Sequence, residues 1–220
     1  MDLDLRSILL DKVLLIPAIF IAFTFHEYAH ALVADRLGDK TPRFQGRLTL
    51  NPLVHTDIIG FILFLVVGFG YAKPVQTNPS AYKHYYKDDL KVSAAGPIAN
   101  LVVAFIFALL TGVMLKLTTN NSFSSNMILD VVFKILLNVV YLNCILFLFN
   151  LIPLPGFDGF HILRDLFPKA FYNIEGTLYQ YQIFILLIFI MPIIGGNSIA
   201  SLIVGKPAYL LTNFLLSIIH

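Results

Sequence analysis

Apolar residues in this chain gather in long, nearly unbroken runs. Three runs and one C-terminal region are long enough to cross a bilayer as helices: Ile8 to Ala34, Val92 to Leu117, Ile128 to Leu151, and about Leu178 to Ile219. A bilayer core about 30 Å thick needs about 20 apolar residues in a helix. The pattern predicts an all-α polytopic membrane protein with about five to six membrane segments.

The C-terminal region is interrupted twice. Met191-Pro192 and Gly195-Gly196-Asn197 break the helical pattern, and Gly205-Lys206-Pro207 breaks it again. The region could therefore hold two spans, or one span followed by one more short helix, and its topology stays open. The whole chain, 1–220, is predicted to be a single membrane domain, with a core over about 8–165 and C-terminal membrane helices over about 178–219.

A shorter apolar run, Ile58 to Gly70, predicts a different element. About thirteen helical residues rise only about 20 Å, which is short of the hydrocarbon core. We expect this run to be re-entrant or partly inserted. The flanking segments 43–50 and 71–76 alternate in a β-like way, which predicts small β-strands that pair beside this short run.

The composition agrees with a membrane location. Hydrophobic residues make up 58% of the chain and charged residues 13%, too apolar for a soluble domain. The net charge is +2, without a basic run that has interleaved aromatics, so we expect no nucleic-acid partner. Cys144 is the one cysteine, which excludes a disulfide framework and a C-x-x-C metal pair within the chain.

The first apolar run carries an H-E-x-x-H motif near its end, His26-Glu27-Tyr28-Ala29-His30. Two histidines four residues apart project from one face of a helix, so their imidazole nitrogens can converge on one metal ion. The glutamate between them is then placed to activate water as a general base. The motif predicts a zinc site with His26 and His30 as ligands and Glu27 as a catalytic residue.

Two alternatives to a zinc site remain open for this motif. H-E-x-x-H also occurs on ordinary solvated helices, and here it could lie in the headgroup region or form a polar cluster without a metal. An ionisable side chain at bilayer depth costs about 2.5–3.5 kcal/mol, and the motif holds three in five residues. A bound cation would compensate that cost, which favours the metal site.

A catalytic zinc ion takes three protein ligands, so the histidine pair needs a third donor. The segment Asn150 to Gly159 ends the third run, and its prolines and glycines predict irregular backbone that must line an enclosed cavity. Asp158 is the predicted third ligand, and Asn150 is a candidate to orient substrate or stabilise an oxyanion. Both residues could instead be ordinary turn or helix-terminus residues.

Three further polar residues are candidates for a place in the site. His55 and His161 are alternative ligands, and His161 is the stronger rival because it follows Asp158 by three residues. Each is also typical of a turn or an interface. Asn100, in a helix that opens with Gly96-Pro97, can hydrogen-bond across a helix interface or toward the cavity.

H-E-Y-A-H followed far downstream by N-L-I-P-L-P-G-F-D-G resembles the site-2 protease family of intramembrane zinc metalloproteases. Segments 46–55, 71–75 and 95–100 are similar to stretches of its small prokaryotic members, which lack PDZ and CBS domains, so the resemblance covers roughly residues 8–165. It implies that His26, His30 and Asp158 bind zinc and that Glu27 activates water. Gly156-Phe157 departs from the proline and leucine that many members carry there.

Charge predicts the orientation in the cell membrane. If the short run is re-entrant, residues 35–57, 71–91 and 153–177 share one face, and that face carries ten lysines and arginines: Arg36, Lys40, Arg43, Arg47, Lys73, Lys83, Lys87, Lys91, Arg164 and Lys169. The opposite loop, Thr118 to Met127, has none. By the positive-inside rule, the site of this multi-pass protein is expected to open toward the cytoplasm.

The predicted function is hydrolysis of peptide bonds within or near transmembrane segments of membrane-protein substrates, with one Zn²⁺ per chain. The expected partners are those substrates and the lipid bilayer, and the residues do not indicate an oligomeric state. A membrane metal-ion transporter is an alternative, because buried ionisable residues also mark ion pathways. A non-catalytic scaffold that binds membrane proteins is a second alternative.

Overall fold

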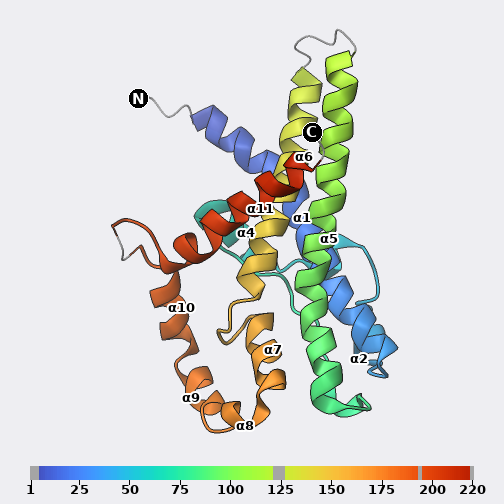
Figure 1. The fold of residues 1–220 in the computed structure, drawn as a ribbon, viewed down its shortest axis with the longest axis vertical. Coiled ribbons are helices and arrows are strands. Elements are labelled where there is room, and N and C mark those ends of the chain that lie inside the picture. The colour runs from blue at the N-terminus through green and yellow to red at the C-terminus, as the bar shows by residue number, and fades with distance from the viewer. Residues whose placement is uncertain (1–4, 121–126, 193–194, 219–220) are drawn as a thin grey trace.

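The structure is a computed structural model that describes residues 5–120, 127–192 and 195–218. Three long helices pack on one another at its centre: α1 (Leu5–Arg36), α5 (Tyr85–Asn120) and α6 (Met127–Asn150) (Figure 1). All three are long and apolar enough to cross a membrane, at the positions predicted from the first three apolar runs. The described chain is therefore mostly helical, with three helices that could span a membrane.

Shorter elements connect and flank these helices. They are α2 (Thr41–Phe44), α3 (Pro52–His55), α4 (Ile58–Val67), the 3-10 turn η1 (Pro79–Ala81), α7 (Asp158–Leu166), α8 (Pro168–Phe171), α9 (Glu175–Gln180), α10 (Gln182–Ile190), the π-helical turn η2 (Ser201–Gly205) and α11 (Lys206–Ser217). Figure 1 shows α7 beside the first turns of α5, while α8–α10 lead away from the bundle and α11 returns to it.

Small and branched side chains hold the three long helices together. One buried cluster joins α1, α4, α5 and α6, and it consists of Ala18, Ile19, Ala22, Phe23, Phe64, Val103, Val139 and Leu142. A second cluster joins α5 and α6 to α11, and it consists of Ala104, Ala108, Val140, Cys144, Ala208 and Leu215. The alanines let helix backbones approach closely, which is the main source of helix association in lipid.

The apolar run Ile58 to Gly70 folds into the short helix α4. The Asp57 carboxylate caps its start by accepting from the Gly60 N–H at 2.9 Å, and Gly68 ends it in the left-handed conformation with φ 82°. Ten residues rise about 15 Å as a helix, half of the hydrocarbon core. The helix is too short to span, in line with the expected short element, and its insertion depth stays a prediction.

The predicted pair of small strands is not found among the described residues. Thr56 and Ala72 form one isolated antiparallel bridge, and residues 41–44 form α2, whose first turn holds Pro42. Residues 71–77 do run extended along the site, and we call them the extended segment. Its neighbour is the Arg47 guanidinium, which donates to the Lys73 and Pro74 carbonyls where a strand would pair. Pro74 also lacks the N–H that a regular ladder needs.

The C-terminal region differs from the predictions of two spans, or of one span and one short helix. The first break is found, because α10 ends at Ile190, and no helix over 175–192 or 195–218 is long enough to span. The second break is not found: Gly205 keeps helical φ and ψ, and η2 runs directly into α11. Pro207 lies in the first turn of α11, where a missing N–H is tolerated.

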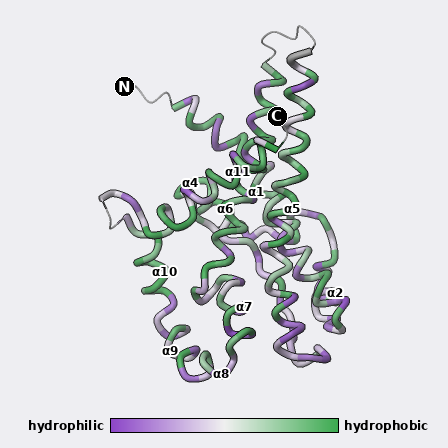
Figure 2. The backbone as a smooth tube through the Cα atoms, viewed as in Figure 1, coloured by the Kyte–Doolittle hydropathy of each residue, from purple (hydrophilic) through white to green (hydrophobic). Residues whose placement is uncertain are grey.

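The two ends of the bundle differ in character. The end with α2 and the first turns of α5 is rich in hydrophilic positions, whereas the middle of α5 and α6 is mostly hydrophobic (Figure 2). Figure 1 shows α2, α7, α8 and α9 at this end, as the orientation argument requires. The predicted opposite loop, Thr118 to Met127, lies mostly outside the described residues.

Candidate metal centre

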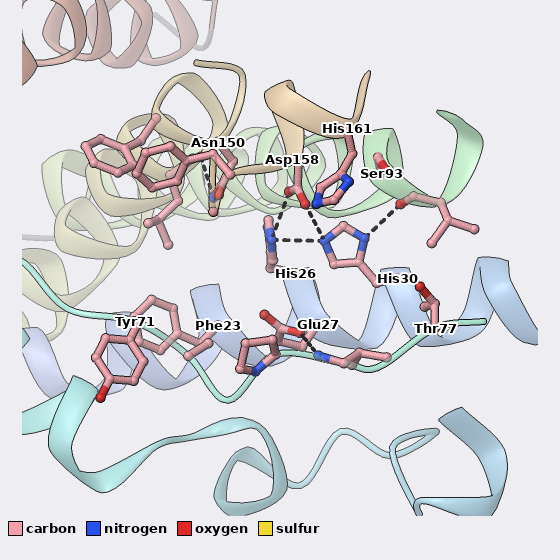
Figure 3. Close-up of a pocket in the computed structure, with 18 of the residues that line it drawn as sticks. Phe23, His26, Glu27, His30, Tyr71, Thr77, Ser93, Asn150, Asp158 and His161 are labelled. Carbon is pink, nitrogen blue, oxygen red and sulfur yellow. Dashed lines mark hydrogen bonds and ion pairs between the residues drawn. The ribbon is translucent and has the colours of Figure 1, made fainter. Parts of the chain in front are cut away.

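Helix α1 presents the two histidines of the motif side by side. His26 and His30 are one turn apart and 8% and 9% exposed, and their Nε2 atoms lie 3.1 Å from each other. Both imidazoles point from α1 toward α7 (Figure 3). The four-residue spacing thus produces the convergence expected of it.

Asp158 reaches the same point from the other end of the sequence. Helix α6 ends at Asn150, the chain turns over residues 151–157, and Asp158 is the first residue of α7. Gly159 is needed there, because a Cβ would overlap the backbone at Leu151. Asp158 Oδ2 lies 3.2 Å from His26 Nε2, and its Oδ1 lies 3.3 Å from His30 Nε2.

The hydrogen bonds of the imidazoles show which of their nitrogen atoms carry a proton. His30 Nδ1 lies 2.7 Å from the Val92 carbonyl, and His26 Nδ1 lies 2.7 Å from Asn100 Oδ1. An imidazole that donates from Nδ1 keeps a lone pair on Nε2, so the close Nε2 atoms cannot hydrogen-bond to each other. Asp158 Oδ2 is buried without a hydrogen-bond partner. Three acceptors therefore converge, and a cation would satisfy all of them.

The spacing and the free room also fit a metal ion. Ligands about 2.0–2.1 Å from a tetrahedral zinc ion lie about 3.3 Å from one another, close to the separations found here. Within the described parts of the chain, these three residues are the His, Cys, Asp or Glu group near enough to hold an ion. Residue 96 on α5 is glycine, and a Cβ there would overlap His30 Nε2 and lie 2.7 Å from His26 Nε2.

Glu27 lies between α1 and the extended segment. It is 7% exposed, and its Oε2 accepts a hydrogen bond from the Val75 N–H at 2.8 Å (Figure 3). Arg47 fixes that segment by donating to three backbone carbonyls, those of Val54, Lys73 and Pro74. The predicted base and the backbone beside it therefore form one hydrogen-bonded unit.

The remaining predicted residues divide into two groups. Asn150 and His161 line the same cavity, of about 550 Å³, but neither belongs to the three-residue ligand group. The Asn150 amide donates to the Leu146 carbonyl at 3.0 Å, and its second N–H remains for another partner. His55 is fully buried away from the ligands, with Nε2 2.8 Å from the Thr49 carbonyl.

Burial shifts the pKa of two titratable side chains on α7. Burial, helped by Arg164, lowers the pKa of His161, which keeps that imidazole neutral. Burial also raises the pKa of Asp165 to about 6, against the attraction of Arg164.

An ion pair ties α7 to α5 beside the ligands. Arg164 contacts the Asp89 carboxylate, and its Nε donates to Asp165 Oδ1 at 2.8 Å. Arg164 and Asp89 also line the cavity. This pair and the fully buried Phe160 both hold α7 in its packed position.

Sequence reasoning missed two residues that shape the site, Asn143 and Arg47. Asn143 is fully buried and bonds to Asn100, whose predicted hydrogen bonds across helix interfaces are confirmed, and Arg47 organises the extended segment. An asparagine inside an apolar span was the available signal for Asn143, because intramembrane polar residues seek partners. Nothing in the sequence around Arg47 distinguishes it from a surface arginine.

Comparison with known proteins identifies the family of this chain. A family model described as "Peptidase family M50" matches residues 14–191. "Putative zinc metalloprotease YwhC" of Bacillus subtilis is 44% identical over 158 residues, 71% of this chain and 70% of that protein. "Putative zinc metalloprotease Rip2" of Mycolicibacterium smegmatis is 31% identical over 162 residues, 69% of this chain and 56% of that protein. No solved structure matches the chain.

The match over residues 14–191 covers most of the chain, including both halves of the ligand group. The chain therefore belongs to peptidase family M50, the site-2 protease family, and is a metalloprotease of the zinc-dependent class. Three long apolar helices are consistent with a membrane protein.

Proposed function

We propose that this protein is an intramembrane zinc endopeptidase that cleaves membrane proteins within or near their transmembrane segments. The observation that carries the proposal is the convergence of His26, His30 and Asp158 among three apolar helices, with Glu27 lining the same cavity. His26, His30 and Asp158 hold one zinc ion per chain, and Glu27 is the general base.

A bound zinc ion supplies a Lewis acid, which polarises the scissile carbonyl and makes water easier to deprotonate. Glu27 takes the proton from the attacking water and passes it to the leaving amine. The second N–H of Asn150 orients the substrate backbone or stabilises the developing oxyanion.

A helical substrate hides its carbonyls in hydrogen bonds between residues four apart, so it must unwind before it can be cut. The extended segment supports a way to hold the unwound peptide, because it already runs along the cavity beside Glu27. A substrate strand would pair with its remaining free backbone groups. Pairing is limited to the ends of the segment, since Lys73, Pro74 and Val75 already use backbone groups internally.

The proposed location is the cell membrane, crossed several times, with the site opening toward the cytoplasm. The excess of lysine and arginine on the face with α2 and α7 supports this orientation. A reporter that is active only in the cytoplasm, fused to the C-terminal end of α7, tests this orientation directly. An inactive reporter there would contradict the orientation.

The test of the function is to purify the protein in detergent, count its zinc, and compare it with Glu27→Gln on a panel of single-span substrates. We expect one zinc per chain in both proteins and cleavage only by the wild type. A metal-ion transporter would instead move zinc across vesicle membranes and leave every substrate intact. A scaffold would bind substrates equally well with either residue and cut none.

A further inference from the structure

A chain of buried amides runs behind His26 through all three long helices. His26 Nδ1 lies 2.7 Å from Asn100 Oδ1 on α5, and Asn100 Nδ2 lies 2.9 Å from Asn143 Oδ1 on α6. Asn143 Nδ2 donates to the Val139 carbonyl at 2.8 Å, and Asn100 Nδ2 also donates to the Ala22 carbonyl at 3.1 Å. Both asparagines are 0% exposed.

The direction of every hydrogen bond in this chain is fixed by its ends. Backbone carbonyls only accept, so the Val139 carbonyl obliges Asn143 to present its NH₂ group, and the Ala22 carbonyl obliges Asn100 to do the same. Asn100 must then turn its oxygen toward His26. His26 Nδ1 must therefore carry the proton, which leaves the lone pair on Nε2, the atom that faces Asp158.

The opposite arrangement would block a metal ion. An imidazole protonated on Nε2 would point its N–H at the ligand group, and Asn100 with a flipped amide would stabilise that form. Asn143 opposes the flip, because it offers an oxygen where a flipped Asn100 would place its own oxygen. The amide chain thus selects one tautomer and one ring orientation of His26.

We propose that Asn100 and Asn143 are positioning residues that prepare His26 for zinc, an inference that rests on the proposed metal site. Asn100 acts directly on the imidazole, and Asn143 acts through Asn100. The Val92 carbonyl accepts from His30 Nδ1 in the same way, and no side-chain substitution removes that carbonyl. Outer partners of this kind change metal affinity by about 10–100-fold when they are removed.

A zinc affinity measurement separates this role from simple packing. The purified wild type, Asn100→Leu, Asn143→Leu and the double variant are titrated against zinc buffered by a chelator, without any substrate. We expect Asn100→Leu to bind zinc about 10–100-fold more weakly and Asn143→Leu less than about 10-fold. The double variant is expected to match Asn100→Leu, because Asn143 has no effect once its target is gone.

A matched variant on the same helix acts as the control. Thr111 is another fully buried polar residue on α5, but its hydroxyl bonds to the Phe107 carbonyl of its own helix, so Thr111→Val should leave zinc affinity unchanged. Cobalt in place of zinc should show an altered visible spectrum in Asn100→Leu and an unaltered one in Thr111→Val.

The outcomes separate this inference from the proposed function. A wild type that retains no zinc overturns the metal site itself. If the wild type binds zinc and Asn100→Leu binds it equally well, this inference alone fails, as it does if Thr111→Val weakens zinc as much. Should Asn100→Leu not fold, Asn143→Leu carries the same test, and full zinc affinity with an unaltered cobalt spectrum there would overturn the inference.

Discussion

The two halves of the candidate metal centre are built in different ways. The histidine half lies in the middle of the bundle, where α5 supplies an acceptor for each Nδ1 atom through Asn100 and Val92. The carboxylate half is a single residue at the start of α7, and Asp158 Oδ2 has no hydrogen-bond partner of its own.

This difference teaches how the site is assembled. Packing and hydrogen bonds within the bundle set the imidazoles before any ion arrives, so this half is preorganised. The position of Asp158 depends on the turn over 151–157 and on the ion pair between Arg164 and Asp89. A metal ion would therefore act as a further link between α7 and the bundle. Removing metal should loosen α7 and leave α1 and α5 in place.

Asp158→Asn removes the carboxylate half of the metal centre and has the largest expected effect on zinc affinity. Removing a residue that only contacts a metal ligand lowers metal affinity by at most about 100-fold. Losing a ligand itself should lower zinc affinity by more than that. Hydrogen exchange should then speed up in α7 but not in α1. His161→Asn is the matched control, because His161 lines the same cavity outside the ligand group and should keep zinc. Zinc lost from His161→Asn instead would make His161 the ligand.

Arg47→Gln tests whether the base side of the site is separate from both halves. The variant loses hydrogen bonds to two carbonyls of the extended segment, those of Lys73 and Pro74, and to the Val54 carbonyl of α3. Displacing the segment by about 1 Å should lower turnover about 100-fold while zinc content is unchanged. Arg43→Gln is the control, because Arg43 pairs with Asp35 instead. Equal loss of turnover in both variants would contradict the assigned role.

Gly156→Ala sharpens the role of the turn that carries Asp158. Gly156 has φ 98°, a conformation that strains alanine by about 1–2 kcal/mol. We expect zinc affinity to fall about 10-fold, measured by chelator competition. Gly176→Ala in α9 is the control, since a Cβ there meets open space. Unchanged affinity in Gly156→Ala would mean that this turn does not position the ligand.

The smallest expected effect is on the free energy of unfolding, and it comes from the ionisation of Asp165. Its pKa is raised to about 6, so between about pH 4 and 6 the native protein holds a proton that the unfolded chain has released. The free energy of unfolding should therefore fall as the pH rises through that window. Asp165→Asn cannot lose this proton and should be more stable at pH 7 by on the order of 1 kcal/mol. Parallel pH profiles of thermal unfolding would contradict this.

The three long helices could be predicted because their signal is local. Unbroken apolar length over Ile8 to Ala34 and its two later counterparts needs no tertiary information. The prediction of paired strands was wrong because tertiary contacts override the local pattern. Segment 43–50 has a β-like pattern, but Pro42 lies in the first turn of α2, and Arg47 donates to the carbonyls that a partner strand would use. The predicted break at Gly205-Lys206-Pro207 is not found, because proline is tolerated in the first turn of a helix.

The candidate ligands could be predicted from residue chemistry and spacing. His26 and His30 share a motif, and Asp158 follows a helix end that must turn at membrane depth. The residues behind them could not, because Asn143 and Gly96 gain their roles only when α5 and α6 pack against α1. A sequence shows that Asn143 is polar in an apolar run, but not which side chain it faces.

The most direct test of the account is the X-ray absorption spectrum of zinc in the purified protein, because it reports the atoms around the ion. We predict two imidazole ligands from His26 and His30, oxygen from Asp158, and the loss of the second imidazole in His26→Asn. A third imidazole, or a sulfur ligand from Cys144, would contradict the claim that an early helix and a late turn share one ion.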